Sequence, residues 1–346
     1  MSAAEMSAGW ADRGGPAQPL LIATGLQKYF PLAGGGAVRA VDGVSFTVAK
    51  GETLGVVGES GCGKSTLARL LLHLIRPDRG ELVFDGDTVG APRGIGLRDL
   101  RRQAQMVFQD SASSLNPRMP VRDSVAFGPR VLGRKRAQAH DEADEALRRV
   151  GLDPALFGPR YPHELSGGQK QRVNIARALA LQPRLVILDE AVSALDKSVE
   201  AQVLNLLAAL KRTLGLTYVF ISHDLAVVRH VSDRVLVMYL GMVAESGPAD
   251  AVFARPLHPY TRALLASRLS MDPNRRVEQA PISGDPPSPA NPPSGCRFRT
   301  RCPHAEPVCA AVVPVPADWM GHQAACHMLL PASGHSVALA AAAAAA

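Results

Sequence analysis

The segment from Gly58 to Ser65 reads GESGCGKS, and it constrains the fold of this 346-residue chain more than any other segment. It follows a strand-like apolar run, Glu52 to Val57, and precedes a run of helical composition, Ser65 to Ile75. A glycine-rich loop between a strand and a helix lets backbone amides converge on phosphate oxygens without side-chain clashes. Because GxxxxGK[ST] in this context is the phosphate-loop pattern, we predict a nucleotide site in an α/β fold.

The residues of this loop suit a nucleoside triphosphate and its metal ion. The helix N-terminus carries partial positive charge, Lys64 adds a full charge near the β- and γ-phosphates, and Ser65 offers a hydroxyl to Mg²⁺. A glycine-rich turn that matches by chance is the alternative, which the flanking strand and helix disfavour. The predicted ATP contacts are Gly58, Glu59, Ser60, Gly61, Cys62, Gly63, Lys64, Ser65 and Thr66.

A second buried-strand candidate, Leu185 to Asp189, is followed directly by another acid, Glu190. At such a strand end, Asp189 can hold Mg²⁺ through water and Glu190 can polarise the attacking water as a catalytic base. Taken alone, two acids after an apolar strand would indicate only a solvated edge. Their position behind a phosphate loop favours the catalytic reading.

The segment LSGGQ, followed by the helical run KQRVNIARALALQ, resembles the signature of the ABC ATPases. Three further segments match that family in its fixed order: Gln109 in MVFQD resembles the Q-loop, SALD the D-loop, and His223 in ISHD the switch histidine. Each segment has an ordinary structural alternative when taken singly, and the joint order argues against it. The signature comprises Leu165, Ser166, Gly167, Gly168 and Gln169, and the D-loop Ser193, Ala194, Leu195 and Asp196.

The resemblance implies how these segments work together. ABC ATPases pack head to tail, so the signature of one subunit contacts the ATP held by the other. Catalysis is assigned to Glu190, His223 and Gln109, and Gln109 would join Ser65 and Asp189 around Mg²⁺.

Two further positions bear on the resemblance. The family stacks an aromatic residue on adenine, which is Phe30 by alignment, with Tyr29 as the alternative. Ala191 stands where many relatives carry proline, but both acids before it are intact, so hydrolysis is expected.

The order of the predicted elements gives an α/β ABC-type phosphate-loop ATPase. We expect a largely parallel sheet core, an antiparallel β layer over Leu21 to Val48, and an inserted helical subdomain over about 121–182. The ATPase domain would span 20–255, between a disordered tail at 1–19 and a small cysteine-containing extension at 256–330. Residues 331–346 form a low-complexity tail.

Four longer segments resemble the oligopeptide/dipeptide (peptide/nickel) importer ATPases over roughly residues 20–330: VVGESGCGKSTLARLL, SSLNPRM, YPHELSGGQKQR and HPYTRALL. The resemblance implies two membrane permeases, a second ATP-binding subunit, either a related one or another copy, and an external solute-binding protein. It places the chain on the cytoplasmic face of the cell membrane. The solute is left open, because relatives of this kind carry peptides, nickel or other small molecules.

The net charge of +7 leaves another class of ABC ATPase to consider, which acts on nucleic acid or ribosomes. Such proteins usually carry two ATPase cassettes or long coiled coils. This sequence has one phosphate loop, one signature and no sustained heptads, so we expect no nucleic-acid partner.

Four of the five cysteines crowd the C-terminal part, namely Cys296, Cys302, Cys309 and Cys326. Four thiols suffice for one tetrahedral metal ion or one iron–sulfur cluster. The spacing lacks the CxxC pairs of common zinc sites, and it resembles the module in which some peptide-importer ATPases hold a [4Fe–4S] cluster. We expect that cluster in a structural role, with zinc or unligated thiols as alternatives, and with Arg297, Arg299 and Arg301 offsetting its charge.

Overall fold

The computed structural model describes residues 18–111, 113–267, 284–319 and 321–338. Of the two predicted tails, at 1–19 and 331–346, residues 1–17 and 339–346 lie outside these ranges. In the described part no helix is both long and apolar enough to span a membrane.

The central sheet has eight strands in the order β11-β12-β10-β9-β3-β8-β7-β6. Its middle strands, from β9 to β6, pair in parallel and are buried along almost their whole length, which explains their continuous apolar composition. The predicted parallel core is therefore confirmed. These strands are β3 (Thr53–Val57), β6 (Ala104–Val107), β7 (Leu185–Asp189), β8 (Thr217–Ile221) and β9 (Arg234–Tyr239).

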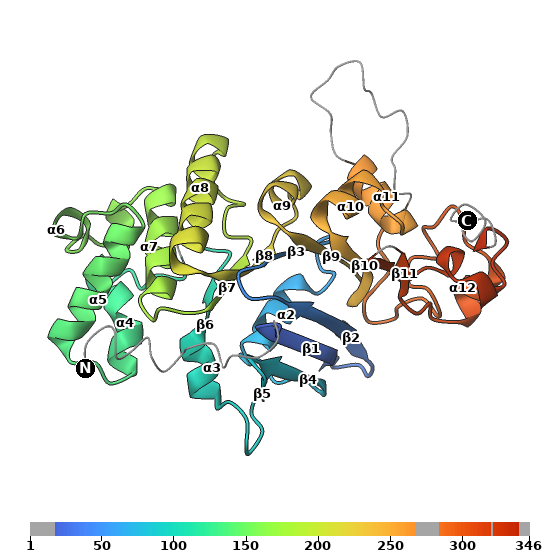
Figure 1. The fold of residues 1–346 in the computed structure, drawn as a ribbon, viewed down its shortest axis with the longest axis horizontal. Helices are drawn as coiled ribbons and strands as arrows, with labels where there is room; N and C mark the ends of the chain where they lie inside the picture. Colours follow the sequence, from blue (N-terminus) through green and yellow to red (C-terminus); the bar gives the residue numbers. More distant parts are fainter. Residues whose placement is uncertain (1–17, 112, 268–283, 320, 339–346) are drawn as a thin grey trace.

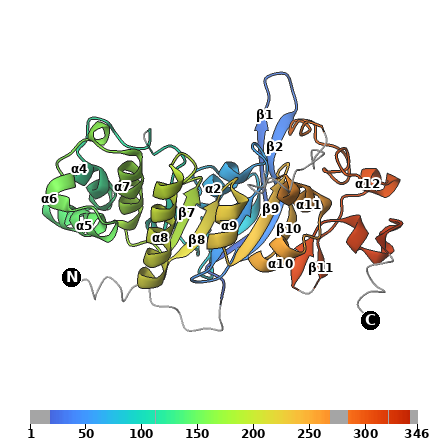
Figure 2. The ribbon, with the colours of Figure 1, turned by 90° about the horizontal axis from the view of Figure 1, so that it is seen from above.

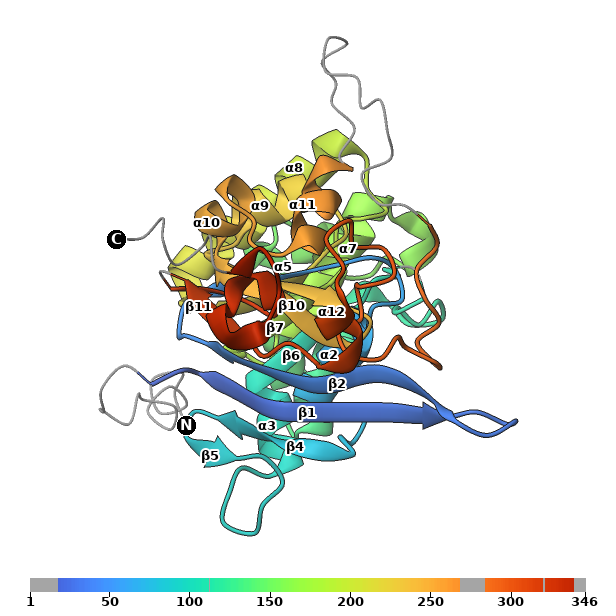
Figure 3. The same cartoon turned by 90° about the vertical axis from the view of Figure 1, so that its right-hand side faces the viewer.

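A second sheet of four antiparallel strands, ordered β2-β1-β4-β5, confirms the predicted β layer. Its members are β1 (Leu21–Pro31), β2 (Ala37–Val48), β4 (Arg79–Phe84) and β5 (Asp87–Thr88). Figure 3 shows this sheet beneath the central sheet. Helix α2 (Lys64–Leu71) lies at their junction, because its buried leucines share one core with residues of both sheets.

The helical subdomain is confirmed as a separate group of helices at one end of the molecule, as Figures 1 and 2 show. It contains α4 (Val121–Val131), α5 (Arg136–Arg149), α6 (Pro154–Phe157), the 3-10 turn η2 (Pro162–Glu164) and α7 (Gly167–Leu179). Helix α3 (Leu97–Gln103) leads into β6. The outer face of the central sheet is covered by α8 (Lys197–Leu214), α9 (Leu225–Val231), α10 (Ala249–Ala254) and α11 (Pro259–Ala266).

The cysteine-containing extension is joined to the ATPase core through the central sheet. Strand β10 (Met242–Pro248) pairs antiparallel with β9 on one side and with β12 (His322–Ala324) on the other. The remaining elements are α12 (Pro307–Ala311), β11 (Ala317–Trp319), η3 (His327–Leu329) and η4 (Pro331–Ser333). The extension thus continues the sheet at the end opposite the helical subdomain (Figure 2).

Candidate active site

The phosphate loop connects the buried end of β3 to the start of α2. Gly63 precedes the helix with a φ of 106°, in the left-handed region, and a Cβ there would overlap the carbonyl oxygen of Ala40. A Cβ at Gly58 would similarly overlap the carbonyl oxygen of Met238. Both glycines are therefore required for the loop to approach its neighbours.

Lys64 is buried inside this loop. Its ammonium donates hydrogen bonds to the carbonyl oxygens of Gly58, at 2.7 Å, and Glu59, at 3.0 Å. The loop's own backbone thus fixes a cation at the first turn of α2, where a phosphate group would add to its partners.

Two of the predicted Mg²⁺ ligands are adjacent. The Ser65 hydroxyl donates to Oδ1 of Asp189 at 3.1 Å, and burial raises the pKa of Asp189 although this hydrogen bond opposes the shift. One hydroxyl and one carboxylate match the coordination preference of Mg²⁺, which usually binds one or two carboxylates together with phosphate oxygens and water.

Two of the predicted catalytic residues, Gln109 and His223, contact the carboxylate of the third, Glu190. Nε2 of Gln109 donates to Oε2 of Glu190 at 2.9 Å, and Nδ1 of His223 lies 3.4 Å from the same oxygen. Glu190 has a φ of 48°, a left-handed conformation that non-glycine residues rarely adopt. Such strained residues cluster at active sites, where the surrounding structure holds them.

The signature lies at the exposed N-terminus of α7, on the helical subdomain. Ser166 and Gln169 form a capping box: the Ser166 hydroxyl accepts from the Gln169 amide, and the Gln169 side chain accepts from the Ser166 amide at 2.9 Å. Leu165 is buried beneath them. The side chain of Val199 packs so closely on Gly168 that a Cβ there would overlap it.

The predicted D-loop runs directly from the predicted catalytic residue Glu190 to α8. The Ser193 hydroxyl donates to the carbonyl oxygen of Glu190 at 2.9 Å, and Asp196 precedes the first turn of the helix. Ala191, where proline is common among relatives, is buried. The chain between Glu190 and Ser193 thus keeps a hydrogen-bonded turn without that proline.

The two candidate aromatic residues for adenine differ in their surroundings. The Tyr29 hydroxyl donates to Asp42, and both burial and this hydrogen bond raise the pKa of Tyr29. Phe30 leaves 39% of its surface exposed. Phe30 is thus the more exposed of the two, and the Lys28 ammonium lies 5.7 Å from the centre of its ring.

The four C-terminal cysteines line one small cavity, together with the buried ring of His327. Burial raises the pKa of the Cys296 thiol to about 11 and that of Cys326 to about 12. All five cysteines are free thiols. Within the described ranges, however, no three His, Cys, Asp or Glu side chains are grouped as a metal ion requires, so this arrangement does not by itself support the predicted iron–sulfur cluster or zinc.

Two residues that the sequence did not assign to the nucleotide site contact its phosphate loop. Arg301 forms an ion pair with Glu59, and the Tyr260 hydroxyl accepts a hydrogen bond from the Glu59 amide. Arg301 was expected to offset charge at the cysteines, and Arg297 likewise is paired elsewhere, with Asp42. No local motif marks these pairs, because the partners lie far apart in the sequence.

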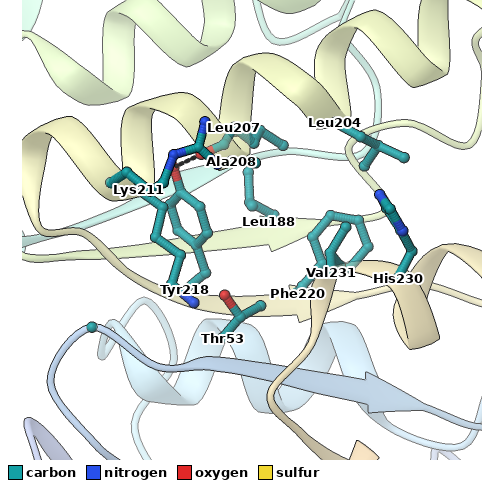
Figure 4. A pocket seen from close by; sticks show the side chains of 12 residues that line it. Thr53, Leu188, Leu204, Leu207, Ala208, Lys211, Tyr218, Phe220, His230 and Val231 are labelled. Atoms are coloured by element: carbon teal, nitrogen blue, oxygen red, sulfur yellow. Dashed lines mark hydrogen bonds between the residues drawn. The ribbon is translucent and has the colours of Figure 1, made fainter.

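A separate hollow of about 450 Å³ lies between α8 and the central sheet. Figure 4 shows its mainly apolar walls and the Tyr218 hydroxyl, which donates to the carbonyl oxygen of Leu207 at 3.0 Å. None of the predicted site residues lines this hollow, so it is distinct from the nucleotide site.

Comparison with known families agrees with this geometry. A family model described as "ABC transporter" matches residues 41–193, and one described as "Oligopeptide/dipeptide transporter, C-terminal region" matches residues 244–309. The solved structure of cbiO1 from Clostridium perfringens, part of the ABC transporter complex cbiONQ, has a TM-score of 0.59 at 29% identity and covers 68% of this chain and 91% of its own. The dimeric post-hydrolysis structure of the ATP-binding cassette MJ0796, bound to ADP and Pi, has a TM-score of 0.59 at 27% identity, with coverages of 66% and 98%.

Curated relatives match over almost the whole chain. The "Probable peptide ABC transporter ATP-binding protein y4tS" of Sinorhizobium fredii is 51% identical over 330 residues, which are 91% of this chain and 91% of that protein. "Oligopeptide transport ATP-binding protein AppF" of Bacillus subtilis is 49% identical over 315 residues, or 88% of this chain and 95% of AppF. The resemblance inferred from the motifs is confirmed, and the chain belongs to the ATP-binding proteins of the ABC transporter family, in the group with an oligopeptide/dipeptide transporter C-terminal region.

Proposed function

We propose that this chain binds and hydrolyses ATP to power the import of peptides, or of a similar small solute, through a membrane transporter. Relatives named for peptide transport at about half identity support the solute class. The observation that carries the proposal is the carboxylate of Glu190, held against Gln109 and His223. It follows directly on Asp189, which is bonded to the phosphate-loop hydroxyl of Ser65.

Each of these residues has a proposed part in phosphoryl transfer. Backbone amides of the loop and the ammonium of Lys64 bind the β- and γ-phosphates, and Ser65, Asp189 and Gln109 hold Mg²⁺. When bound, Mg²⁺ supplies charge neutralisation on the phosphate oxygens. Glu190 accepts a hydrogen bond from the attacking water and orients it toward the γ-phosphate.

Gln109 and His223 fix the carboxylate that performs this task. Both side chains approach the same oxygen of Glu190, which leaves the second oxygen to accept from water. For the base of the nucleotide, the exposed ring of Phe30 is the stacking surface, because the hydroxyl of Tyr29 is bound to Asp42.

A second ATP-binding subunit, of the same or a related kind, completes the site. The exposed Ser166 and Gly167 at the N-terminus of α7 offer amides and helix-dipole charge to the ATP of the partner subunit. Closure is favourable only while the γ-phosphate is present, so hydrolysis reopens the dimer. The D-loop, from Ser193 to Asp196, lies beside both catalytic and signature elements and is proposed to contact the partner.

The permeases are proposed to dock in a cleft between the ATPase core and the helical subdomain. This cleft, of about 680 Å³, is lined by Gln109, Ser113 and Ser114 and by the exposed rings of Phe108 and Phe127. Exposed aromatic side chains in a hollow are typical of protein interfaces. Docking here would link Gln109 to the permease and hold the chain on the cytoplasmic face of the membrane, opposite the external binding protein.

The cysteine cavity is proposed to hold a [4Fe–4S] cluster in a structural role, with zinc as the alternative. All four cysteines line one cavity, although no three of these side chains are grouped there as a metal ion requires, so the ligands would have to move together on binding. The buried Nδ1 of His327 in the cavity wall has no hydrogen-bond partner. Metal analysis and the visible absorption of anaerobically purified protein test the proposal. Iron with sulfide is expected; protein that contains neither iron nor zinc would overturn it.

Reconstitution of this chain with the permeases and the binding protein of its transporter tests the transport function. We expect phosphate release and solute uptake in proteoliposomes to require this chain and to rise when the binding protein is loaded with peptide. Sedimentation with ribosomes, without association with permease-containing membranes, would favour the nucleic-acid class instead.

A further inference from the structure

Arg301 of the C-terminal extension makes a two-pronged ion pair with Glu59 of the phosphate loop. Nη1 and Nη2 of Arg301 lie 2.7 and 3.0 Å from the two carboxylate oxygens of Glu59. The Arg301 side chain is only 6% exposed and that of Glu59 22%. Two hydrogen bonds between partly buried side chains fix both the orientation of the Glu59 carboxylate and its distance from the guanidinium. A single exposed ion pair fixes neither.

Tyr260 holds the same loop residue through its backbone. The Tyr260 hydroxyl accepts a hydrogen bond from the Glu59 amide at 2.9 Å. Its ring is fully buried against Tyr239 of the central sheet and Phe298 of the extension, with centroid distances of 4.6 and 5.4 Å. Since the Glu59 carbonyl accepts from Lys64, all three polar groups of Glu59 are engaged, two of them by residues after the ATPase core.

A second connection reaches the loop from Arg297. This buried guanidinium donates to Asp42 of β2 and to the carbonyl oxygen of Leu240. The next residue, Gly241, donates its amide to the carbonyl oxygen of Cys62 at 2.9 Å, in the middle of the phosphate loop. Both arginines stand between Cys296 and Cys302, so one short segment of the extension supports the loop at two places.

We propose that the C-terminal extension supports the nucleotide site, and that its residues Arg301 and Tyr260 position the phosphate loop. Because Glu59 is held in place before ATP binds, less free energy is lost to ordering of the phosphate loop when ATP binds. The guanidinium also balances a carboxylate that would repel the triphosphate. This inference rests on the proposed placement of ATP in the loop.

The test is equilibrium binding of a fluorescent ATP analogue to the full chain with Mg²⁺, beside thermal melting as a check on folding. Arg301→Gln should raise the dissociation constant about tenfold, while kcat at saturating ATP in the assembled transporter changes less than about threefold. Arg301→Lys, which keeps the charge but not the two-pronged contact, should recover part of the affinity. The matched control is Arg299→Gln, whose guanidinium donates within the extension to Ser294.

A double-mutant cycle separates this role from general stability. Adding Glu59→Gln to Arg301→Gln should weaken binding no further than Arg301→Gln alone, because the two side chains act as one unit. Additive losses, an equal loss in Arg299→Gln, or wild-type affinity in folded Arg301→Gln would overturn the proposal.

Tyr260→Phe provides a second variant should Arg301→Gln fail to fold. It removes the hydroxyl that accepts from Glu59 but keeps the buried ring, and Tyr218→Phe removes an equally buried hydroxyl elsewhere (Figure 4). We expect several-fold weaker ATP binding in Tyr260→Phe only; equal binding in both variants would contradict the proposal. Lys64→Ala shows separately whether ATP occupies the loop, because that variant should lose binding whatever the extension does.

Discussion

The Ser65 hydroxyl lies 3.1 Å from Oδ1 of Asp189, although the two residues are 124 positions apart. The parallel pairing of β3, β8 and β7 explains this contact, because it brings the carboxyl ends of the strands to one edge of the sheet. Ser65 lies in the first turn of α2, directly after the loop that follows β3, and Asp189 ends β7. The sheet topology thus places the two residues assigned to Mg²⁺ next to each other.

Gly63→Ala should abolish nucleotide binding and lower the melting temperature. A methyl group at this position meets the Ala40 carbonyl oxygen, and the backbone φ of 106° disfavours any side chain. Gly133→Ala is the matched control, because Gly133 has a similar φ of 93° with open space around it. Calorimetry and nucleotide titration of both variants provide the check. Equal effects would show that backbone strain, and not the close approach to Ala40, sets the requirement.

Ser166→Arg should leave ATP binding by the single chain intact and block ATP-driven dimerisation. The large cation fills the exposed helix N-terminus where the partner's γ-phosphate is proposed to bind. Asp153→Arg is the control, since it removes a helix cap from the same subdomain without touching the signature. Light scattering with and without ATP measures the outcome, and a dimer that still forms in Ser166→Arg would contradict the proposed arrangement.

Asp85→Asn should destabilise the fold more at neutral pH than at low pH. Asp85 accepts a hydrogen bond from Arg184 at 2.6 Å and pairs with Lys50 at 3.2 Å. Burial alone would raise the pKa of Asp85, but the hydrogen bonds from these two cations lower it. A lowered carboxylate pKa adds stability above the unfolded value of about 3.9, and this stability is lost as pH falls through the folded value.

The expected loss for Asp85→Asn is about 1–2 kcal/mol in the free energy of unfolding at pH 7, and the loss should be smaller at pH 3. Urea titrations at both pH values measure it, with the exposed Asp141→Asn as control. A deficit of the same size at pH 3 would mean that shape, and not charge, makes Asp85 important.

The parts of the site that were predictable from the sequence are those encoded by contiguous segments. Lys64, Ser166 and Glu190 each sit in a local pattern whose flanking strand or helix was also recognisable. The short strand β12 was not foreseen, because three residues carry too little periodicity to indicate a strand. The second sheet's β4 was missed as well, since its first three residues, a glycine between two charged residues, are exposed.

The contacts that could not be predicted from the sequence join residues that are far apart along the chain. Glu59 and Arg301 each look like an ordinary surface charge in the sequence, and 242 positions separate them. Only the packing of the extension on the central sheet, through the contacts of Phe298 and Tyr260 with Tyr239 of β9, brings them together. Arg301 was therefore assigned to the nearby cysteines instead of the phosphate loop.

The assignment of Glu190 as the catalytic base is the central claim, and ATP turnover by Glu190→Gln in the permease-assembled transporter tests it most directly. Glutamine preserves the size of the side chain and its contact distance to Gln109, so ATP binding should persist. Phosphate release should fall at least about 100-fold, because the residue no longer carries the carboxylate that orients water. Turnover within a few-fold of the wild-type rate, with ATP bound normally, would contradict the account.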